Sequence, residues 1–383
     1  MNVLFISRGI PTKKDPMWGN FEFEQAQAIK NLGHNVALAI IDRRTRLKWR
    51  KIGISRSQRD GIKIFCIFLF PLPKILPVKF RKYIEKWMIL FLYKKIENEC
   101  GRPDIVHAHY LSNIANATVL KEKYHIPIVG TEHFSKVISR STDTKIRFLC
   151  KNCYQKVDMP IAVSRSLATH IKAHYNVDFK VINNMCDTSL FCYNAENREK
   201  KAQNQFVFVS VGSLIQGKNF LSLIEAFYNA KFDNNVYLHI VGEGGERPKL
   251  EKLIKKYNLQ HNIKLFGMKT RLEIAEILQN SDAFVLPSMS ETFGVVYIEA
   301  MASGLPIIAT KCGGPEEFIE EFMGILIPIN DVKTLTESLI EMYNNIENYD
   351  KKRIANECRL RFSPDIIAKQ LEEKYIAAIS MHQ

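Results

Sequence analysis

The segment "PSMSETFGVVYIEAMASGLP", residues 287–306, carries two glutamates eight positions apart, Glu291 and Glu299, with Gly294 between them. It joins the apolar runs 283–286 and 306–310, which we predict to be buried strands, through a helix over residues 295–303. Eight residues of helix span about 12 Å. Paired carboxylates that act as acid and base on one glycosidic bond lie closer, at about 5 to 9.5 Å. We therefore expect the two glutamates to hold different parts of one extended ligand.

The residues between the two glutamates predict a site for an anion. Gly294 allows the backbone to come close to a ligand at the start of the helix. The N–H groups of residues 292–296 would point at that anion, and Glu299 could accept both hydroxyls of a ribose. A ligand with a sugar, phosphates and a ribose in sequence satisfies all three features. The alternative is two ordinary carboxylates at a helix start, where negative charge is favoured; the apolar residues around them weigh against it.

Strands and helices alternate on both sides of this segment, which predicts an α/β protein of two Rossmann-like, doubly wound domains facing across a cleft. Residues 205–363 contain six apolar runs with helices predicted over 219–230, 246–257, 271–279 and 295–303. A similar series occupies residues 1–182, and the polar, Asn-rich segment 183–204 is predicted to be the linker. A last helix, 364–383, opens at Ser363-Pro364-Asp365 and is expected to pack back on the N-terminal domain. In such folds ligands bind at the carboxyl ends of the strands.

Length and composition agree with a two-domain globular protein. The chain has 383 residues and a formal net charge of +14. The first 100 residues hold 20 Lys and Arg against 8 Asp and Glu, whereas residues 201–383 hold 20 against 23. Because there is no secretory signal and no apolar run of the length that spans a bilayer, we expect a cytoplasmic protein. The basic N-terminal half predicts an anionic partner on that side.

Residues 42–97 concentrate this charge, with 16 Lys and Arg against 4 acidic residues, interleaved with aromatic residues. One interpretation is that "KFRKYIEKWMILFLYKK" (79–95) forms an amphipathic helix that lies on an anionic membrane surface. A core helix with a charged, solvated edge is the structural alternative. Nucleic acid is a third possible partner, but the sequence has no recognisable module for it, so we expect none. A pair of histidines, His107 and His109, is expected to combine a packing position and a rim position at a strand end.

The sequence motifs of this chain resemble those of the retaining glycosyltransferases of family 4, which have the GT-B fold and a Glu-x7-Glu element. The resemblance covers nearly the whole chain. The motifs that carry it, besides the segment quoted above, are "WGNFEFEQAQAIKNLGHNV" (18–36), "VGSLIQGKN" (211–219), "VGEGGERPKL" (241–250), "LFGM" (265–268) and "GGPEEFI" (313–319).

This resemblance implies a role for each matching residue. Glu299 binds the donor ribose, Glu291 lies beside the donor sugar, and Lys218 neutralises the diphosphate and the leaving-group charge. His133 is similar to an active-site histidine near sugar and acceptor, so the resemblance implies His133, Glu291 and Lys218 as catalytic residues. The other implied donor-binding residues are Gly19, Asn20, Gly212, Ser213, Gly267, Met268, Thr292, Phe293, Gly294 and Val295.

The resemblance also implies the reaction, which is transfer of a hexosyl group from a nucleotide-diphosphate sugar, with a UDP-sugar favoured. The acceptor is expected to be a hydroxyl of a lipid-linked saccharide in surface polysaccharide synthesis. The chain contains no Asp-x-Asp, so we expect no metal and no other cofactor. One position departs from the family, because Ser213 stands where an arginine is usual. This departure is the feature that favours the alternative, a non-catalytic binder of sugar nucleotides or saccharides.

Overall fold

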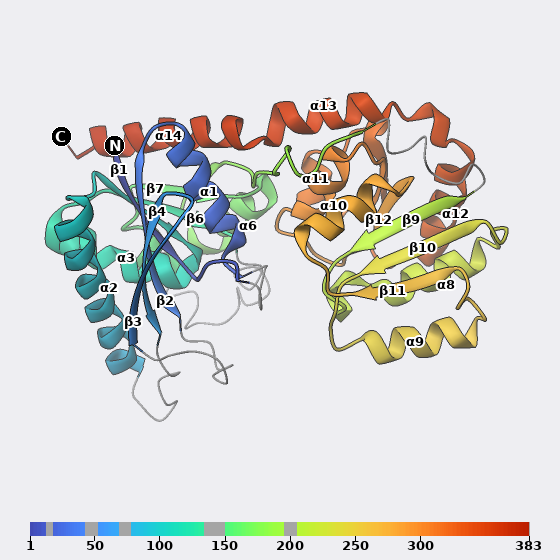
Figure 1. Cartoon of the computed structure of the whole chain (residues 1–383), viewed down its shortest axis with the longest axis horizontal. Coiled ribbons are helices and arrows are strands. Elements are labelled where there is room, and N and C mark those ends of the chain that lie inside the picture. Colours follow the sequence, from blue (N-terminus) through green and yellow to red (C-terminus); the bar gives the residue numbers. More distant parts are fainter. Residues whose placement is uncertain (13–17, 43–52, 69–77, 134–149, 195–204, 383) are drawn as a thin grey trace. The chain divides into compact units, whose positions relative to one another are not determined.

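The computed structural model describes residues 1–12, 18–42, 53–68, 78–133, 150–194 and 205–382. These residues form two compact units, each with its own sheet. The first unit comprises Met1–Asn184 and Pro364–Gln383, and the second comprises Met185–Ser363 (Figure 1). The predicted α/β class and the two Rossmann-like sheets are confirmed.

The first unit is built on an eight-stranded sheet with the order β3-β4-β2-β1-β5-β6-β7-β8. Its elements are β1 (Asn2–Ser7), α1 (Asn20–Asn31), β2 (Asn35–Asp42), β3 (Gly53–Arg59), β4 (Ile62–Phe68), α2 (Val78–Cys100), β5 (Ile105–His109), α3 (Tyr110–Tyr124), β6 (Ile128–Glu132), β7 (Met159–Ala162), α6 (Arg165–Tyr175), β8 (Lys180–Val181) and α14 (Pro364–Ser380). The central strands are apolar runs that are buried along almost their whole length, as expected for parallel strands covered on both faces.

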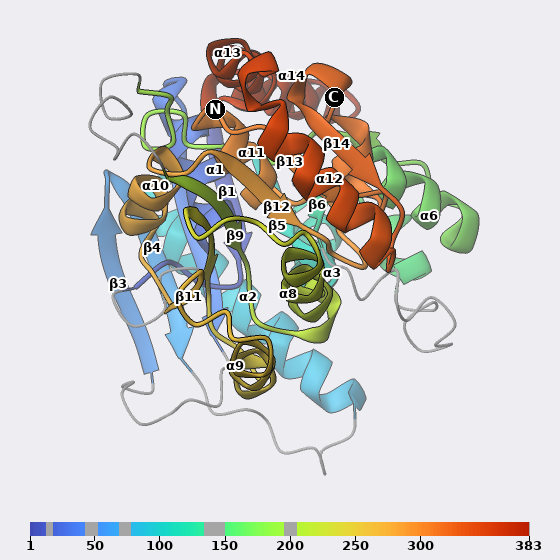
Figure 2. The same cartoon turned by 90° about the vertical axis from the view of Figure 1, so that its right-hand side faces the viewer.

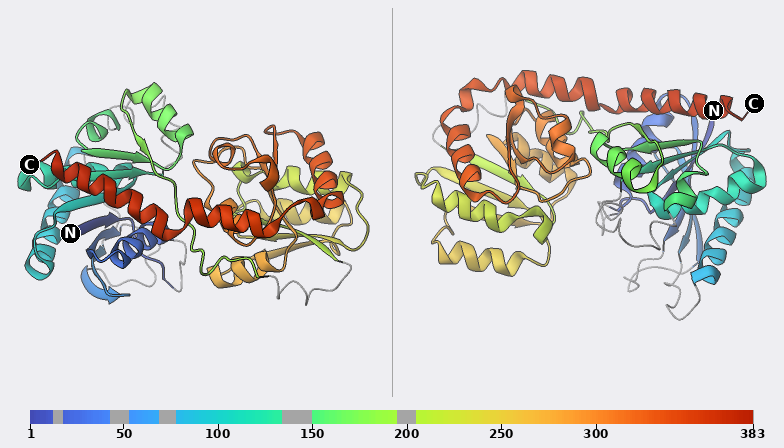
Figure 3. Two further views of the ribbon diagram at one scale, coloured as in Figure 1. Left: turned by 90° about the horizontal axis from the view of Figure 1, so that it is seen from above. Right: turned by 180° about the vertical axis from the view of Figure 1, so that it is seen from behind.

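The C-terminal helix α14 belongs to the first unit although it follows the second unit in the sequence. It packs beside α1 and against β6 and β7 (Figure 3). Two side-chain contacts fix it there: Glu372 is 2.8 Å from His34 of the segment between α1 and β2, and the Tyr375 hydroxyl is 2.6 Å from His107 of β5.

The edge strand β3 departs from the parallel sheet that the sequence predicts. It pairs antiparallel with β4 over residues 53–59 and 62–68. The two strands are joined at Asp60 and Gly61, which both have positive φ values of 50° and 75°. Positive φ at both central residues is typical of the two-residue hairpin turn for which Asp-Gly is preferred. The strand was missed because its sequence, "GISRSQR", is polar and mostly exposed.

The second unit has a six-stranded, wholly parallel sheet with the order β11-β10-β9-β12-β13-β14. Its elements are β9 (Phe206–Val211), α8 (Phe220–Asn229), β10 (Val236–Val241), α9 (Arg247–Lys256), β11 (Ile263–Gly267), α10 (Arg271–Gln279), β12 (Ala283–Leu286), α11 (Val295–Ala302), β13 (Ile307–Thr310), β14 (Gly324–Ile327), α12 (Val332–Asn344) and α13 (Lys351–Phe362). Helix α8 packs against α9 and α12, and α11 packs against α13 (Figure 2). All six strands and the four helices predicted in this half are present.

The segment predicted as a linker, 183–204, is divided in the structure. Residues 185–194 belong to the second unit, where Met185, Cys186 and Phe191 are buried. Residues 195–204 lie outside the described residues, as do 43–52 and 69–77 of the basic segment 42–97. In the part of the chain that the structure describes, no helix is both long and apolar enough to cross a membrane.

Candidate functional site

The predicted site residues of the second unit gather at the carboxyl edge of its sheet. Strands β9 and β12 are neighbours in the middle of the sheet. From β9 the chain continues to β10 on one side, and from β12 it continues to β13 on the other side. The loops after these two strands therefore diverge, which is the place where open α/β sheets bind ligands. The loop after β9 carries Gly212, Ser213 and Lys218, and the loop after β12 carries Glu291 and Gly294.

Lys218 and Glu291 meet at the topological switch point of the sheet, which is where the loops after β9 and β12 diverge. The Lys218 ammonium forms an ion pair with the Glu291 carboxylate. The side chains are 21% and 11% exposed, so the pair is largely but not completely removed from solvent. The Ser288 hydroxyl also donates to Glu291 at 2.7 Å, and the Met289 amide donates to the Gly217 carbonyl at 2.8 Å. These bonds hold the two loops together and fix a cation and an anion at one point of the sheet edge.

Helix α11 begins directly after Gly294. This glycine has a φ of 93°, and a Cβ added there would lie 2.5 Å from the ring of Tyr297. Its conformation therefore requires glycine. Among the described residues, the Val295 and Val296 amides donate no backbone hydrogen bond, as is usual in a first helical turn, so they can receive an anion. The Phe293 side chain is buried against Phe318, which leaves its backbone as the part that can face a ligand.

Glu299 lies in the second turn of α11 and is only 5% exposed. Its carboxylate is 3.3 Å from the Arg271 guanidinium at the start of α10. Arg271 in turn lies over the ring of Phe191 at 5.0 Å. The sequence reasoning missed Arg271, because its partner comes from a different helix. The available signal was a cation at a predicted helix start, directly after Thr270, which caps α10 through its hydroxyl.

Three glycines bring the neighbouring loops of this edge into contact. The Gly212 amide donates to the Val241 carbonyl, and the Gly242 amide donates to the Gly267 carbonyl, both at 2.9 Å. A Cβ on Gly242 would lie 1.9 Å from the Gly212 carbonyl oxygen, so only glycine allows this approach. Ser213 is exposed in the loop after β9, and Met268 is 65% exposed after β11.

The predicted site residues of the first unit also lie at a carboxyl sheet edge. Gly19 precedes α1 with a φ of 73°, and a Cβ there would lie 2.1 Å from the Gly9 carbonyl oxygen. Asn20 is the first residue of α1 and is 6% exposed. Its amide nitrogen has no hydrogen-bond partner within the described part of the chain. A buried donor without a partner is costly, so Asn20 is suited to receive an oxygen of a ligand.

His133 follows β6 and contacts a second buried histidine. Its Nε2 atom lies 3.0 Å from Nδ1 of His109, and His107 is hydrogen-bonded to Thr131 and Tyr375. Burial and, second, the positive charge of Arg8 lower the pKa of His133 to about 3. Burial and the neighbouring His133 lower the pKa of His107 to about 3, and burial lowers that of His109 well below its usual value. His109 is fully buried, so the rim position expected for one histidine of the pair was wrong.

These histidines should make stability depend on pH. Because the folded state keeps them neutral, the unfolded state binds more protons between about pH 6.5 and pH 3. Their contribution is therefore complete above pH 6.5 and is lost as the pH falls, by up to about 1.4 kcal/mol per pH unit for each histidine. We expect urea unfolding of His107→Asn to show a shallower loss between pH 7 and 5 than wild type. His174→Asn, an exposed histidine, is the control; equal slopes for wild type and His107→Asn would contradict this.

Arg8 is a charged neighbour of the buried His133 in the first unit, and it was not predicted as a site residue from the sequence. Its guanidinium is ion-paired at 2.9 Å with Glu22, whose side chain is fully buried, and lies 3.5 Å over the ring of Tyr110. Tyr110 has a φ of 68°, which is unusual for a bulky residue and is typical of functional positions. The signal for Arg8 was its place directly after the first strand, in "NVLFISRG".

Two protein families match consecutive parts of the chain. The model described as "Glycosyltransferase Family 4" matches residues 22–190. The model described as "Glycosyl transferases group 1" matches residues 194–357. The boundary between the two units follows Asn184. The first match lies almost entirely before this boundary, and the second match lies after it.

Individual proteins of known sequence or structure are similar over most of the chain. An uncharacterized glycosyltransferase of Methanocaldococcus jannaschii is 30% identical over 64% of this chain and 66% of its own. The putative teichuronic acid biosynthesis glycosyltransferase TuaC of Bacillus subtilis is 25% identical over 88% of each chain. Among solved structures, sucrose-phosphate synthase from Thermosynechococcus elongatus has a TM-score of 0.79 at 18% identity, with 99% of both chains covered. HepE of Anabaena in complex with UDP has a TM-score of 0.74 at 18% identity, covering 98% and 100%.

Proposed function

Because the chain belongs to the family 4 glycosyltransferases with the GT-B fold, we propose that it is a retaining hexosyltransferase that uses a UDP-sugar. The acceptor is the hydroxyl of a lipid-linked saccharide, and the product is a precursor of a surface polysaccharide. By the family resemblance, the acceptor attacks from the front side of the sugar while the leaving phosphate helps to remove its proton.

The ion pair between Lys218 and Glu291 is the observation that carries this proposal. It stands at the switch point of the second sheet, beside the start of α11, and Glu299 lies in the same helix. In the proposed complex, Lys218 turns from Glu291 to the diphosphate, and the α11 amides bind the same phosphates. Glu291 is then free to accept hydrogen bonds from the sugar, and Glu299 from the ribose. A nucleotide sugar has these groups in this order.

Support for uridine as the base comes from a protein of the same fold. HepE of Anabaena was solved in complex with UDP and with UDP-glucose. Starch Synthase IV of Arabidopsis, bound to ADP, has a TM-score of 0.74 at 15% identity, so the fold alone does not select the base.

Lys218 and the start of α11 can together supply the positive potential that a divalent ion supplies in other transferases. We therefore expect transfer to proceed in EDTA. The test incubates the protein with radiolabelled UDP-hexoses and a lipid-linked saccharide fraction, with and without EDTA, and determines the anomeric configuration of the product by NMR. The expected product keeps the configuration of the donor sugar, at equal rates in both conditions. Inversion would contradict the retaining mechanism, and activity that is lost in EDTA and restored by manganese would contradict metal independence.

The lipid-linked acceptor is supported by one relative and by one surface of the first unit. TuaC is named for teichuronic acid biosynthesis. In the structure, α2 exposes three aromatic side chains at helical spacing: Phe80 at 50%, Tyr83 at 67% and Trp87 at 56%. Lys94 and Lys95 are exposed about two turns after Trp87 along the same helix. An exposed aromatic stripe with lysines is suited to the headgroup region of an anionic bilayer.

Flotation with liposomes tests this peripheral, cytoplasmic-face membrane contact. We expect the protein to float with vesicles that contain anionic lipid and to remain in solution with neutral vesicles. Trp87→Ala should weaken binding by about tenfold, because burying a large apolar side chain contributes about 1.5–3 kcal/mol. Leu360→Ala removes an exposed apolar side chain from α13 and is the control. Equal flotation of wild type and Trp87→Ala would exclude α2 as the contact.

A further inference from the structure

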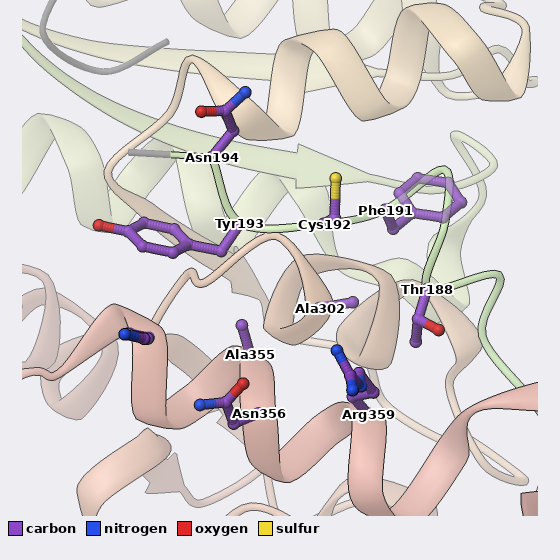
Figure 4. Close-up of a pocket in the computed structure, with 10 residues that line it drawn as sticks. Thr188, Phe191, Cys192, Tyr193, Asn194, Ala302, Ala355, Asn356 and Arg359 are labelled. Atoms are coloured by element: carbon purple, nitrogen blue, oxygen red, sulfur yellow. The ribbon is translucent and has the colours of Figure 1, made fainter. Parts of the chain in front are cut away.

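A cavity of about 460 Å³ lies in the second unit and contains none of the predicted donor-binding residues. One wall is the segment after the unit boundary, the opposite wall is α13, and Ala302 at the end of α11 lies between them (Figure 4). The volume is within the range of small-molecule sites. The lining residues are Thr188, Phe191, Cys192, Tyr193, Asn194, Ala302, Lys352, Ala355, Asn356 and Arg359.

Helix α13 presents one continuous stripe to this cavity. Lys352, Ala355, Asn356 and Arg359 follow the i, i+3, i+4, i+7 spacing of a single helix face. Figure 4 shows Arg359 rising from α13 toward Ala302. The lining contains two cations and no carboxylate, so the cavity carries net positive charge.

Lys352 and Arg359 differ from the other two arginines of α13 in having no side-chain partner among the described residues. Arg353 stacks on the ring of Phe322 at 3.8 Å, and Arg361 is ion-paired with Glu320 at 2.9 Å. In the described part of the chain, the side chains of Lys352 and Arg359 make neither an ion pair nor a hydrogen bond, and both are exposed to the cavity opening. A solvated helix face would also leave cations unpaired, but it would not place them both on the wall of one cavity.

The spacing of the cations indicates the shape of the ligand. Seven residues separate them in the sequence, which corresponds to about 10 Å along the helix. Asn356 follows Lys352 by four residues and precedes Arg359 by three, so its amide offers hydrogen bonds between the two cations. The Thr188 hydroxyl and the Tyr193 ring also line the cavity. We propose that this cavity binds a small sugar that carries a phosphate at each end, with one phosphate on Arg359 and the other on Lys352. Arg359 suits a phosphate because its planar fork can bind two oxygens.

The cavity is physically connected to the candidate donor site. Phe191 lines the cavity and stacks under Arg271 at 5.0 Å, and Arg271 is 3.3 Å from Glu299. Ala302, at the floor, is on the same helix as Glu299. A ligand that moves Phe191 therefore changes the position of Arg271 and of the carboxylate proposed to bind the ribose. This link rests on the proposed function, and it must be reciprocal: the ligand and UDP change each other's affinity by the same factor.

Calorimetric titration of the full chain with fructose 1,6-bisphosphate tests the site itself. We expect saturable binding, with inorganic phosphate weaker and fructose without effect. Arg359→Ala and Lys352→Ala should each weaken binding by about tenfold or more, the cost of losing a charged hydrogen bond. Lys333→Ala removes an exposed lysine of α12 and should change nothing. No binding to wild type, or equal binding to wild type and Arg359→Ala, would overturn the proposal.

A second titration separates the cavity from the donor site. UDP affinity is measured for wild type and Arg359→Ala, each with and without saturating bisphosphate. We expect the bisphosphate to change UDP affinity in wild type and to leave it unchanged in Arg359→Ala, whose UDP affinity without bisphosphate should equal that of wild type. If bisphosphate binds but never changes UDP affinity, the link through Phe191 and Arg271 is wrong. If UDP fails to bind while bisphosphate binds, the proposed donor site fails and the cavity remains.

Discussion

Replacing Lys218 by alanine is expected to lower the turnover number by a factor of about 10²–10³, the usual effect of removing one group that stabilises transition-state charge. Breaking the bond between sugar and diphosphate places new negative charge on the leaving phosphate. The structure holds the Lys218 cation near the N-terminus of α11, where its ion pair with Glu291 keeps it in place before the substrate binds. The variant should therefore lose turnover far more than donor affinity.

The alternative for Lys218 is a purely structural ion pair, and the experiment distinguishes the two. Turnover and thermal unfolding are measured for Lys218→Ala, Glu291→Gln and the double variant. Lys255→Ala, an exposed lysine of α9, is the matched control. A catalytic Lys218 predicts a large loss of turnover with little change in the unfolding temperature without substrate. A lower unfolding temperature with unchanged turnover would show that the pair only joins the two loops.

Replacing Glu299 by alanine should abolish the stabilisation of the protein by UDP. A ligand at 100 times its dissociation constant stabilises the folded state by about 2.7 kcal/mol, which appears as a higher unfolding temperature. In the proposed donor complex Glu299 accepts both ribose hydroxyls; its carboxylate lies in the second turn of α11, 3.3 Å from the Arg271 guanidinium. Without that carboxylate, the two hydroxyls lose their acceptor and the partly buried Arg271 loses a charged partner. The shift should therefore vanish at the same UDP concentration.

Three nucleotides and one control make this measurement decisive. Wild type is tested with UDP, GDP and ADP, and we expect the largest shift with UDP. Glu337→Ala, an exposed glutamate of α12, should respond like wild type. A larger shift with GDP or ADP would change the assigned base, and a full UDP shift in Glu299→Ala would remove Glu299 from the ribose site. No shift with any nucleotide would contradict the donor site as a whole.

The second unit could be predicted almost completely from the sequence. Its three central strands β9, β12 and β13 are short apolar runs that are buried along their whole length, the outer strands are apolar runs that are partly buried, and helical segments separate most of these runs. Parallel strands covered on both faces require such runs, so the sequence signal and the physical requirement coincide. The bounds of α8, α9 and α11 differ from the predicted ones by one residue at most.

The rest depended on information that local patterns do not contain. Strand β3 has a polar sequence, so the Asp60-Gly61 turn is the one local signal that indicates its hairpin with β4. The pairing of Glu299 with Arg271 joins two helices, and the contact of His133 with His109 joins the ends of two strands. In both cases the partners become neighbours only after the strand order is known. The motif identified Glu299 and His133, but the groups that position them come from the tertiary structure.

The place of α14 determines when the first unit can be completed during synthesis. The helix that covers β6 and β7 follows the second unit in the sequence, so it is translated only after residues 185–363. Until then His107 lacks the Tyr375 hydroxyl and an apolar face of the sheet has no cover. The nascent chain must therefore carry an unfinished domain while the whole of the second unit is translated, and in that period it is exposed to aggregation and to chaperones.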